Sequence, residues 1–174
     1  WEIDQPLRDL VERIGESRAV AAYRSSLRGV LALRSLILNH RVDCNWADRM
    51  ALTVAGTSTG LRALADELRL RTRHGLPSYW IEGRDLRSAY GIDRTAALLN
   101  AVNGELHPVK LARGLLAAAI ASGMELVAPA EVTEIGTGRD GVSLQLAGGP
   151  VISAGKVIVC AGYEALPQIP HDRY

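Results

Sequence analysis

Six residues in the C-terminal third match the glycine pattern that binds phosphate in many nucleotide-binding proteins. Gly136-Thr-Gly-Arg-Asp-Gly141 fits GxGxxG, in which a loop after a strand opens a helix whose first amides hold a pyrophosphate. The segment that follows, 142–147, alternates apolar and polar residues, which is typical of a strand and not of a helix. Asp140-Gly141 is also a favoured hairpin turn. The context therefore predicts a surface hairpin and no phosphate site.

Few other residues have spacings that could support chemistry. Cys44 and Cys160 form no CxxC and have no histidine at metal-ligand spacing, so we predict no metal site and favour two free thiols over a disulfide. Cys160 ends an apolar run and is expected to be a small buried hydrophobic residue and not a reactive thiol. Arg49 could bind a carboxylate through two parallel hydrogen bonds, although it is one of many arginines.

The elements expected before about residue 106 are mostly helical. Apolar residues at three- and four-residue steps predict a helix over 7–14, capped by Asp4 or Gln5 and ended by Gly15. A long helix capped by Ser17 should follow, up to about Asn39, and form a hairpin with the first. Beyond it the patterns predict strands at 49–55, 79–82 and 97–103, a helix from its cap at Thr59 to about 74, and a helix over 83–91.

After residue 106 one helix is followed by strands. His107-Pro108 opens a helix that Gly123 ends. Strands are expected at 125–128 and 131–135, followed by 142–146 and 151–153 in a meander. Residues 156–160 are continuously apolar after Lys156, as in a strand covered on both faces. The fold class is therefore α+β.

Four segments in this half resemble a known family. They are Gly104-Glu-Leu-His-Pro108, the helix 111–123, Glu131-Val-Thr-Glu-Ile135 and Lys156-Val-Ile-Val-Cys-Ala-Gly162. In this order they resemble the family of D-amino acid oxidase, glycine oxidase and sarcosine oxidase. Five short segments of the N-terminal part are similar to a branch of this family that includes gamma-glutamylputrescine oxidases. They are Trp1-Glu2, Pro6-Leu7, Ser25-Ser26, Asp43-Cys44 and Gly91-Ile-Asp93.

The resemblance implies a fold and an activity. Residues 1–106 would be part of a substrate domain with its helical hairpin, and 107–174 part of an FAD-binding α/β domain without its GxGxxG unit. The whole protein would oxidise a primary or secondary amine or an amino acid by hydride transfer to FAD, with the difficult chemistry supplied by the cofactor. This piece alone is expected to be inactive and to bind FAD weakly or not at all. Oxidation of a hydroxy acid or glycerol phosphate, or a non-catalytic interaction module, are the alternatives.

The resemblance also suggests residues near the ligands, while no catalytic residue is assigned. Val132 would meet the adenine, although plain core packing explains it equally well. Cys160, Ala161 and Gly162 would approach the flavin, since small residues admit a ligand close to the backbone; a tight turn is the alternative. Asn103, Glu105 and His107 would lie toward the substrate or flavin, with helix capping the simpler role for His107. Arg49 completes the substrate-side set.

Composition limits the possible partners. The 174 residues carry a net charge of +1, with 48% hydrophobic and 22% charged residues, which gives no field to attract nucleic acid. No apolar run approaches the ~20 residues of a membrane span. We therefore expect a cytoplasmic protein, and the resemblance implies a small-molecule amine substrate. The chain has no start methionine, which suggests an internal fragment whose exposed sheet edge could self-associate.

Overall fold

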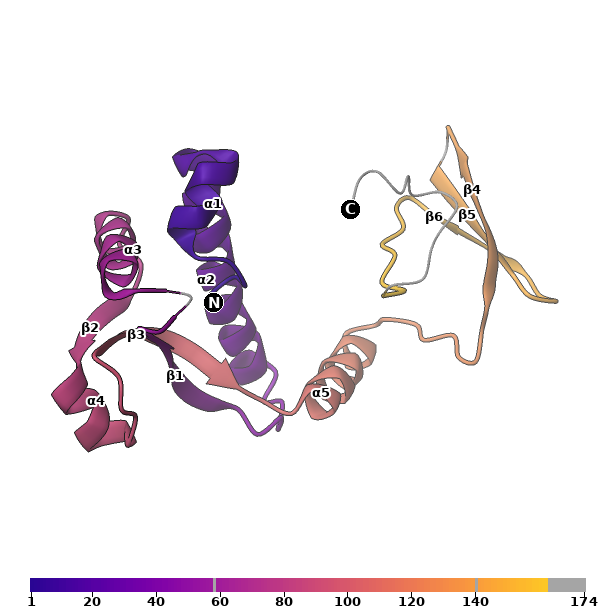
Figure 1. The fold of residues 1–174 in the computed structure, drawn as a ribbon. Helices are drawn as coiled ribbons and strands as arrows, with labels where there is room; N and C mark the ends of the chain where they lie inside the picture. Colours follow the sequence, from indigo (N-terminus) through magenta and orange to yellow (C-terminus); the bar gives the residue numbers. More distant parts are fainter. Residues whose placement is uncertain (58, 140, 163–174) are drawn as a thin grey trace. The chain divides into compact units, whose positions relative to one another are not determined.

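A computed structural model describes residues 1–57, 59–139 and 141–162. The chain divides into two compact units, Trp1–Met124 and Glu125–Tyr174, and each is described by itself. Figure 1 shows helices and strands in both. The structure confirms a mixed α and β architecture with small antiparallel sheets. Within the described residues, no helix is long and apolar enough to cross a membrane.

The first unit begins with the predicted pair of helices. α1 (Leu7–Ile14) and α2 (Glu16–Asn39) are joined by Gly15, whose φ of 84° is readily adopted only by glycine. They pack against each other, and their apolar stripes form a core with Leu76. The buried residues of this core are Trp1, Leu7, Ala19, Val20, Tyr23 and Leu76. The helix bounds expected from the sequence are therefore confirmed within two residues.

The predicted N-caps of the first three helices are wrong. α1 has Pro6 at its N-cap, and its Leu7 and Arg8 amides donate to the two carboxylate oxygens of Glu67, at 2.8 and 2.9 Å. Glu67 lies on α3 (Leu61–Arg73), so this cap comes from a distant helix instead of Asp4 or Gln5. Gly15 and Gly60 are the N-caps of α2 and α3, where Ser17 and Thr59 were expected.

The first unit also contains a three-stranded antiparallel sheet. β1 (Ala47–Val54) and β2 (Ser78–Glu82) flank β3 (Ala96–Glu105). α3 covers the sheet through a second core, in which Leu64 packs with Ala55 and Leu98. α4 (Gly83–Tyr90) contacts β2 and β3, and α2 contacts β3. Figure 1 shows α2 and α3 on the same side of the sheet.

A bulge interrupts the pairing of β1 with β3. Arg49 is paired with Asn103 and Ala51 with Asn100, so Met50 stands opposite two residues of β3. One of the two, Val102, has a φ of 63°. A β-branched side chain at positive φ is a true backbone outlier that costs about 1–3 kcal/mol. The bulge therefore stores strain immediately before Asn103.

α5 (Pro108–Ala121) follows the sheet and ends this unit's regular structure. Its Gly114 lies against Val42, and a Cβ at this glycine would overlap the valine side chain. This close approach places the middle of α5 next to the loop that follows α2. The helix predicted to open at His107-Pro108 is confirmed.

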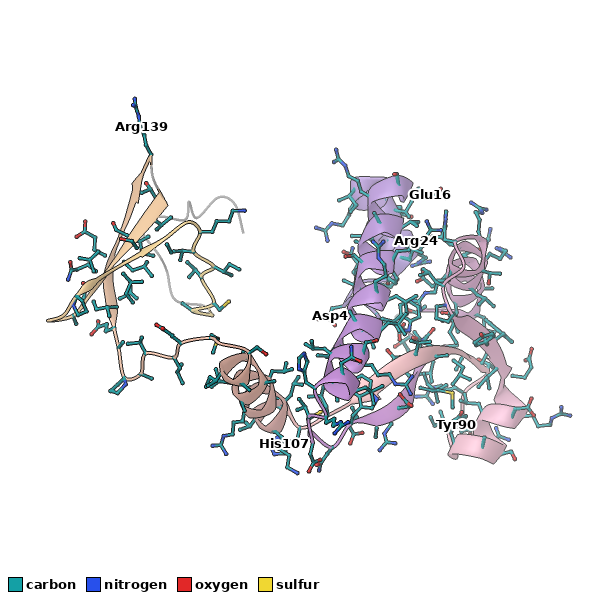
Figure 2. All side chains as sticks on the ribbon, turned by 180° about the vertical axis from the view of Figure 1, so that it is seen from behind. Asp4, Glu16, Arg24, Tyr90, His107 and Arg139 are labelled. Atoms are coloured by element: carbon teal, nitrogen blue, oxygen red, sulfur yellow. The ribbon has the colours of Figure 1, made fainter. Side chains whose placement is uncertain are left out.

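The second unit contains the predicted meander. β4 (Val132–Gly138), β5 (Gly141–Leu146) and β6 (Val151–Ala154) are antiparallel neighbours in this order. Gly138 is paired with Gly141, so the GxGxxG sequence is a hairpin and not a phosphate loop, as predicted. Asp140, part of the predicted turn, lies outside the described residues. Arg139 projects from the hairpin tip (Figure 2).

Two predicted strands are wrong. Residues 125–128 and 156–160 have no regular structure, and Ile158 is 89% exposed. Cys160 is likewise exposed and not buried. A strand covered on both faces needs neighbouring strands to satisfy its backbone, and no described segment is paired with 156–160. The apolar run alone was therefore insufficient to form the buried strand.

Candidate functional site

The main candidate site is a cavity of about 390 Å³ inside the first unit. We call it the α2–sheet cavity, because α2 supplies one wall and the ends of β1 and β3 supply the other. Its volume is in the range of small-molecule sites. Apolar side chains predominate in its lining, with three charged groups among them. The lining residues are Val30, Leu31, Arg34, Trp46, Asp48, Arg49, Met50, Val102 and Asn103.

Three residues of the cavity lining, Arg34, Trp46 and Asp48, are hydrogen-bonded to one another. Asp48 accepts hydrogen bonds from Arg34 Nη2 at 2.8 Å and from Trp46 Nε1 at 3.0 Å. Trp46 in turn lies against Gly104, where a Cβ would overlap its ring. The glycine thus allows the indole to approach the backbone of β3. Arg34 and Trp46 therefore fix the Asp48 carboxylate in place.

Arg49 forms an ion pair of similar exposure, but within the described residues its partner has no second side-chain donor. Its Nε donates to Glu105 Oε2 at 2.9 Å, and the two side chains are 56% and 67% exposed. Ion pairs at such exposure contribute about 0–1 kcal/mol. The contact uses one donor, Nε, whereas a bidentate carboxylate would take two of the parallel N–H donors of the guanidinium. Arg49 is therefore the cation in the cavity best suited to bind an anion.

Asn103 is fully occupied by the protein. Its Oδ1 accepts from the Trp1 backbone nitrogen at 2.7 Å, and its Nδ2 donates to the Asn100 carbonyl at 2.9 Å. The amide therefore holds the end of β3 against the N-terminal segment. Asn103 and Arg49 are register partners that line the same cavity. The structure thus brings together two of the four predicted substrate-side residues in the cavity lining, and a third, Glu105, contacts Arg49.

His107, the fourth, lies elsewhere. Its Nδ1 accepts from the Lys110 amide at 3.4 Å, and its own amide donates to the Cys44 carbonyl at 2.8 Å. It caps α5, as Figure 2 shows at the start of that helix. The capping role is thus observed, and His107 does not line the α2–sheet cavity.

A buried polar network between α3 and the sheet was not expected from the sequence. Arg71 forms ion pairs with Glu67 at 2.7 Å and Glu2 at 2.8 Å, and donates to Asn100 Oδ1 at 2.9 Å. Burial alone would lower the pKa of Arg71, but its hydrogen bonds and charge contacts with the two glutamates outweigh burial and raise it. This network ties α3 to β3 and to the N-terminal segment.

Tyr23 closes one side of this network. Its hydroxyl donates to the Gln5 carbonyl at 2.6 Å, and its ring lies 5.5 Å from the Arg71 guanidinium. Burial raises the pKa of Tyr23 to about 12, with Arg71 opposing the shift. The Trp1 ring lies at the same distance from Arg71. All these groups are satisfied by one another, so the network is structural.

Val132 and the 160–162 turn lie in the second unit. Val132 begins β4 and is 46% exposed. Gly162 has a φ of 69° and no atom within 4 Å of where a Cβ would stand. Both positions are open to approach, and their contact with a cofactor remains a prediction. Across residues 1–57, 59–139 and 141–162, no group of three or more potential metal ligands occurs.

Comparison with known proteins identifies the family. Residues 7–173 match the model of the FAD dependent oxidoreductase (DAO) family. The chain belongs to this family. FAD is therefore the family's cofactor, and the resemblance seen in the sequence is confirmed. No curated protein sequence matches the chain.

Solved structures share the fold at low identity. Glycine oxidase from Geobacillus kaustophilus is 18% identical with a TM-score of 0.65, covering 89% of this chain and 40% of its own. L-proline dehydrogenase from P. horikoshii is 13% identical with a TM-score of 0.62, covering 74% and 35%. NikD, an amino acid oxidase of nikkomycin biosynthesis, is 22% identical with a TM-score of 0.55, covering 75% and 34%. The chain thus spans about two fifths of these proteins or less.

The described residues do not fit the pyrophosphate of FAD. A pyrophosphate site needs a glycine loop that leads from a strand into a helix. The glycines that match the motif serve a hairpin instead, where a Cβ at Gly141 would overlap the Ala154 carbonyl. These residues therefore do not by themselves form a site for the pyrophosphate of the flavin cofactor. What they do offer is a cavity for a small ligand.

Sequence reasoning missed Arg34, Trp46 and Asp48 in this cavity. Arg34 is an exposed residue of α2 away from its apolar stripe, a position that in sequence gives no indication of a site. Its partner Asp48 is on β1, and their contact requires the packing of helix on sheet. The tryptophan two residues before Asp48 was a usable indication, because an aromatic donor and a carboxylate on alternate strand residues share one face.

Proposed function

We propose that this chain is part of an FAD-dependent oxidoreductase that acts on an amine or amino acid, and that the α2–sheet cavity helps hold its substrate. Membership of the family supports oxidation with FAD. Two of the solved structures of similar fold are a glycine oxidase and the amino acid oxidase NikD. The observation that carries the cavity's role is the position of Arg49 at its rim, beside apolar walls.

In this proposal Arg49 binds the substrate's carboxylate. Its guanidinium is always charged and can donate two parallel hydrogen bonds. The apolar side chains of Leu31, Met50 and Val102 exclude water around the rest of the substrate. Asn103 acts through the backbone by fixing the end of β3. Val132 and residues 160–162 would face the cofactor, as the resemblance implies.

The test measures turnover by the full-length protein that contains this chain. Oxygen consumption and dye reduction are followed with amino acids, matched amines without a carboxylate, hydroxy acids and glycerol phosphate. Oxidation of the amines or amino acids is expected. Turnover of only the hydroxy acids or glycerol phosphate would replace the proposal with the related alternative, and a protein that binds no flavin would end both.

A substitution in the cavity sharpens this test. In Arg49→Gln the KM for amino acids should rise about 10–100-fold, because hydrogen bonds to a charged group contribute about 1.5–3 kcal/mol. The KM for amines without a carboxylate should be unchanged. Arg18→Gln, at an exposed position of α2 outside the cavity, is the matched control.

A further inference from the structure

The two arginines of the α2–sheet cavity have differently placed partners. Asp48, the partner of Arg34, itself lines the cavity and is also held by Trp46. Glu105, the partner of Arg49, does not line the cavity. Within the described residues its carboxylate accepts a hydrogen bond from Arg49 alone. One ion pair is thus built into the cavity wall, whereas the other joins the rim to the outside.

The Arg49–Glu105 contact is suited to exchange. Both side chains are more than half exposed, so breaking the contact costs little. The contact engages Nε, while a bidentate carboxylate uses the planar fork more completely. Glu105 is also a diagonal neighbour, because Ala47 is its register partner and Arg49 is paired with Asn103. It therefore reaches Arg49 from the end of β3 without blocking the cavity.

We propose that Glu105 is a specificity-determining residue, which occupies Arg49 until the carboxylate of an incoming ligand displaces it. The ligand it admits is a monocarboxylate with an apolar tail, since Leu31, Met50 and Val102 line the space beyond the rim. Glu105 lowers the affinity for every carboxylate by competing for Arg49. It leaves the binding of uncharged ligands unaffected, because these do not need the guanidinium. This inference depends on the proposed function only in treating the ligand as the substrate.

Binding to the chain itself tests the exchange without flavin or turnover. Isothermal titration calorimetry compares hexanoate with hexanamide, which share an apolar tail and differ in charge, and the fluorescence of Trp46 reports occupancy of the cavity. Glu105→Gln should tighten hexanoate binding about 2–5-fold, as expected for removing an exposed ion-pair competitor. Arg49→Gln should weaken it about tenfold or more. Neither variant should change hexanamide binding.

A double variant separates exchange from a general charge effect. If Glu105 acts by occupying Arg49, the gain from Glu105→Gln disappears when Arg49→Gln is also present. A gain that persists in the double variant would show simple repulsion and overturn the proposal. The proposal is also overturned if hexanoate does not bind the native chain, or if it binds the single Glu105→Gln variant no more tightly than the native chain. Asp93→Asn, which removes the exposed partner of Arg87, is the matched control and should change nothing.

These outcomes are independent of the proposed oxidation. An enzyme that oxidises only amines without a carboxylate would contradict the substrate proposal, yet the hexanoate cycle could still give the expected pattern. If the variants do not show the expected pattern of hexanoate binding while amino acids are still oxidised, only the role proposed for Glu105 is contradicted.

Discussion

Arg71 and Glu67 lie one helical turn apart on α3 and form an ion pair, 2.7 Å between Nε and Oε1, in which both side chains are almost fully buried. The same Glu67 carboxylate caps the first amides of α1. This pair therefore links the helical hairpin to the helix that covers the sheet. Removing one partner leaves the other charge buried without compensation, and this destabilises the folded protein much more than removing both partners.

We expect Glu67→Ala to lower the free energy of unfolding by about 3–5 kcal/mol, measured by chemical denaturation. Glu67→Gln combined with Arg71→Met should be less destabilising than Glu67→Ala, since no unpaired charge is left between these two positions. Asp66→Asn is the control, because Asp66 pairs with Arg69 at the surface and its loss should cost no more than about 1 kcal/mol. Equal effects at positions 66 and 67 would contradict the buried role of the pair.

Tyr23 should make stability fall at high pH. Its folded-state pKa is raised to about 12 from an ordinary value of 10.0, mainly by burial. Between these values the unfolded chain loses the phenolic proton while the folded chain keeps it, so stability present below pH 10 is lost as pH rises toward 12. Denaturation curves across this window should show the fall, and Tyr23→Phe should reduce it. An identical slope in the variant would contradict the assignment.

Val102→Gly should not destabilise the protein, although glycine normally weakens a strand. Glycine adopts the φ of 63° at this position without strain, and Val102 is 38% exposed, so little burial is lost. We expect stability equal to the native chain or higher by up to about 1 kcal/mol. Val54→Gly, at a β1 position without positive φ, should cost about 1 kcal/mol or more. A similar loss in both variants would argue against strain at the bulge.

Gly104→Ala should disturb the cavity. The new Cβ would overlap the Trp46 ring, which must move and release Asp48. Overpacking of this kind costs about 1–3 kcal/mol, and the fluorescence of Trp46 should change with it. Gly29→Ala is the control, since a Cβ there meets open space inside α2 and should stabilise the helix by about 1 kcal/mol. Unchanged fluorescence in Gly104→Ala would contradict the close approach.

The chain alone should bind FAD no more tightly than about the micromolar range, because the glycines that match GxGxxG form a hairpin and do not open a helix. Calorimetric titration of FAD into the chain measures this directly. Submicromolar affinity would require a pyrophosphate site that the described fold does not contain.

Local patterns predicted much of this fold. The three- and four-residue spacing of apolar side chains fixed the extents of α1, α2 and α5, since a helix buries one stripe whatever its partner. Alternation after Gly141 excluded the phosphate loop, because a hairpin is decided by residues adjacent in sequence. The family resemblance likewise rested on short segments in a consistent order.

Contacts between distant residues could not be predicted in this way. The amides of α1 are capped by Glu67, about sixty residues away, because packing brought α3 there. Arg34 joins the cavity only through Asp48 on another element. The apolar run at 156–160 shows the converse, since a buried strand requires partners whose hydrogen bonds it shares. The sequence by itself determined which segments could form helices and hairpins, whereas tertiary packing decided which charges were buried, paired or left exchangeable.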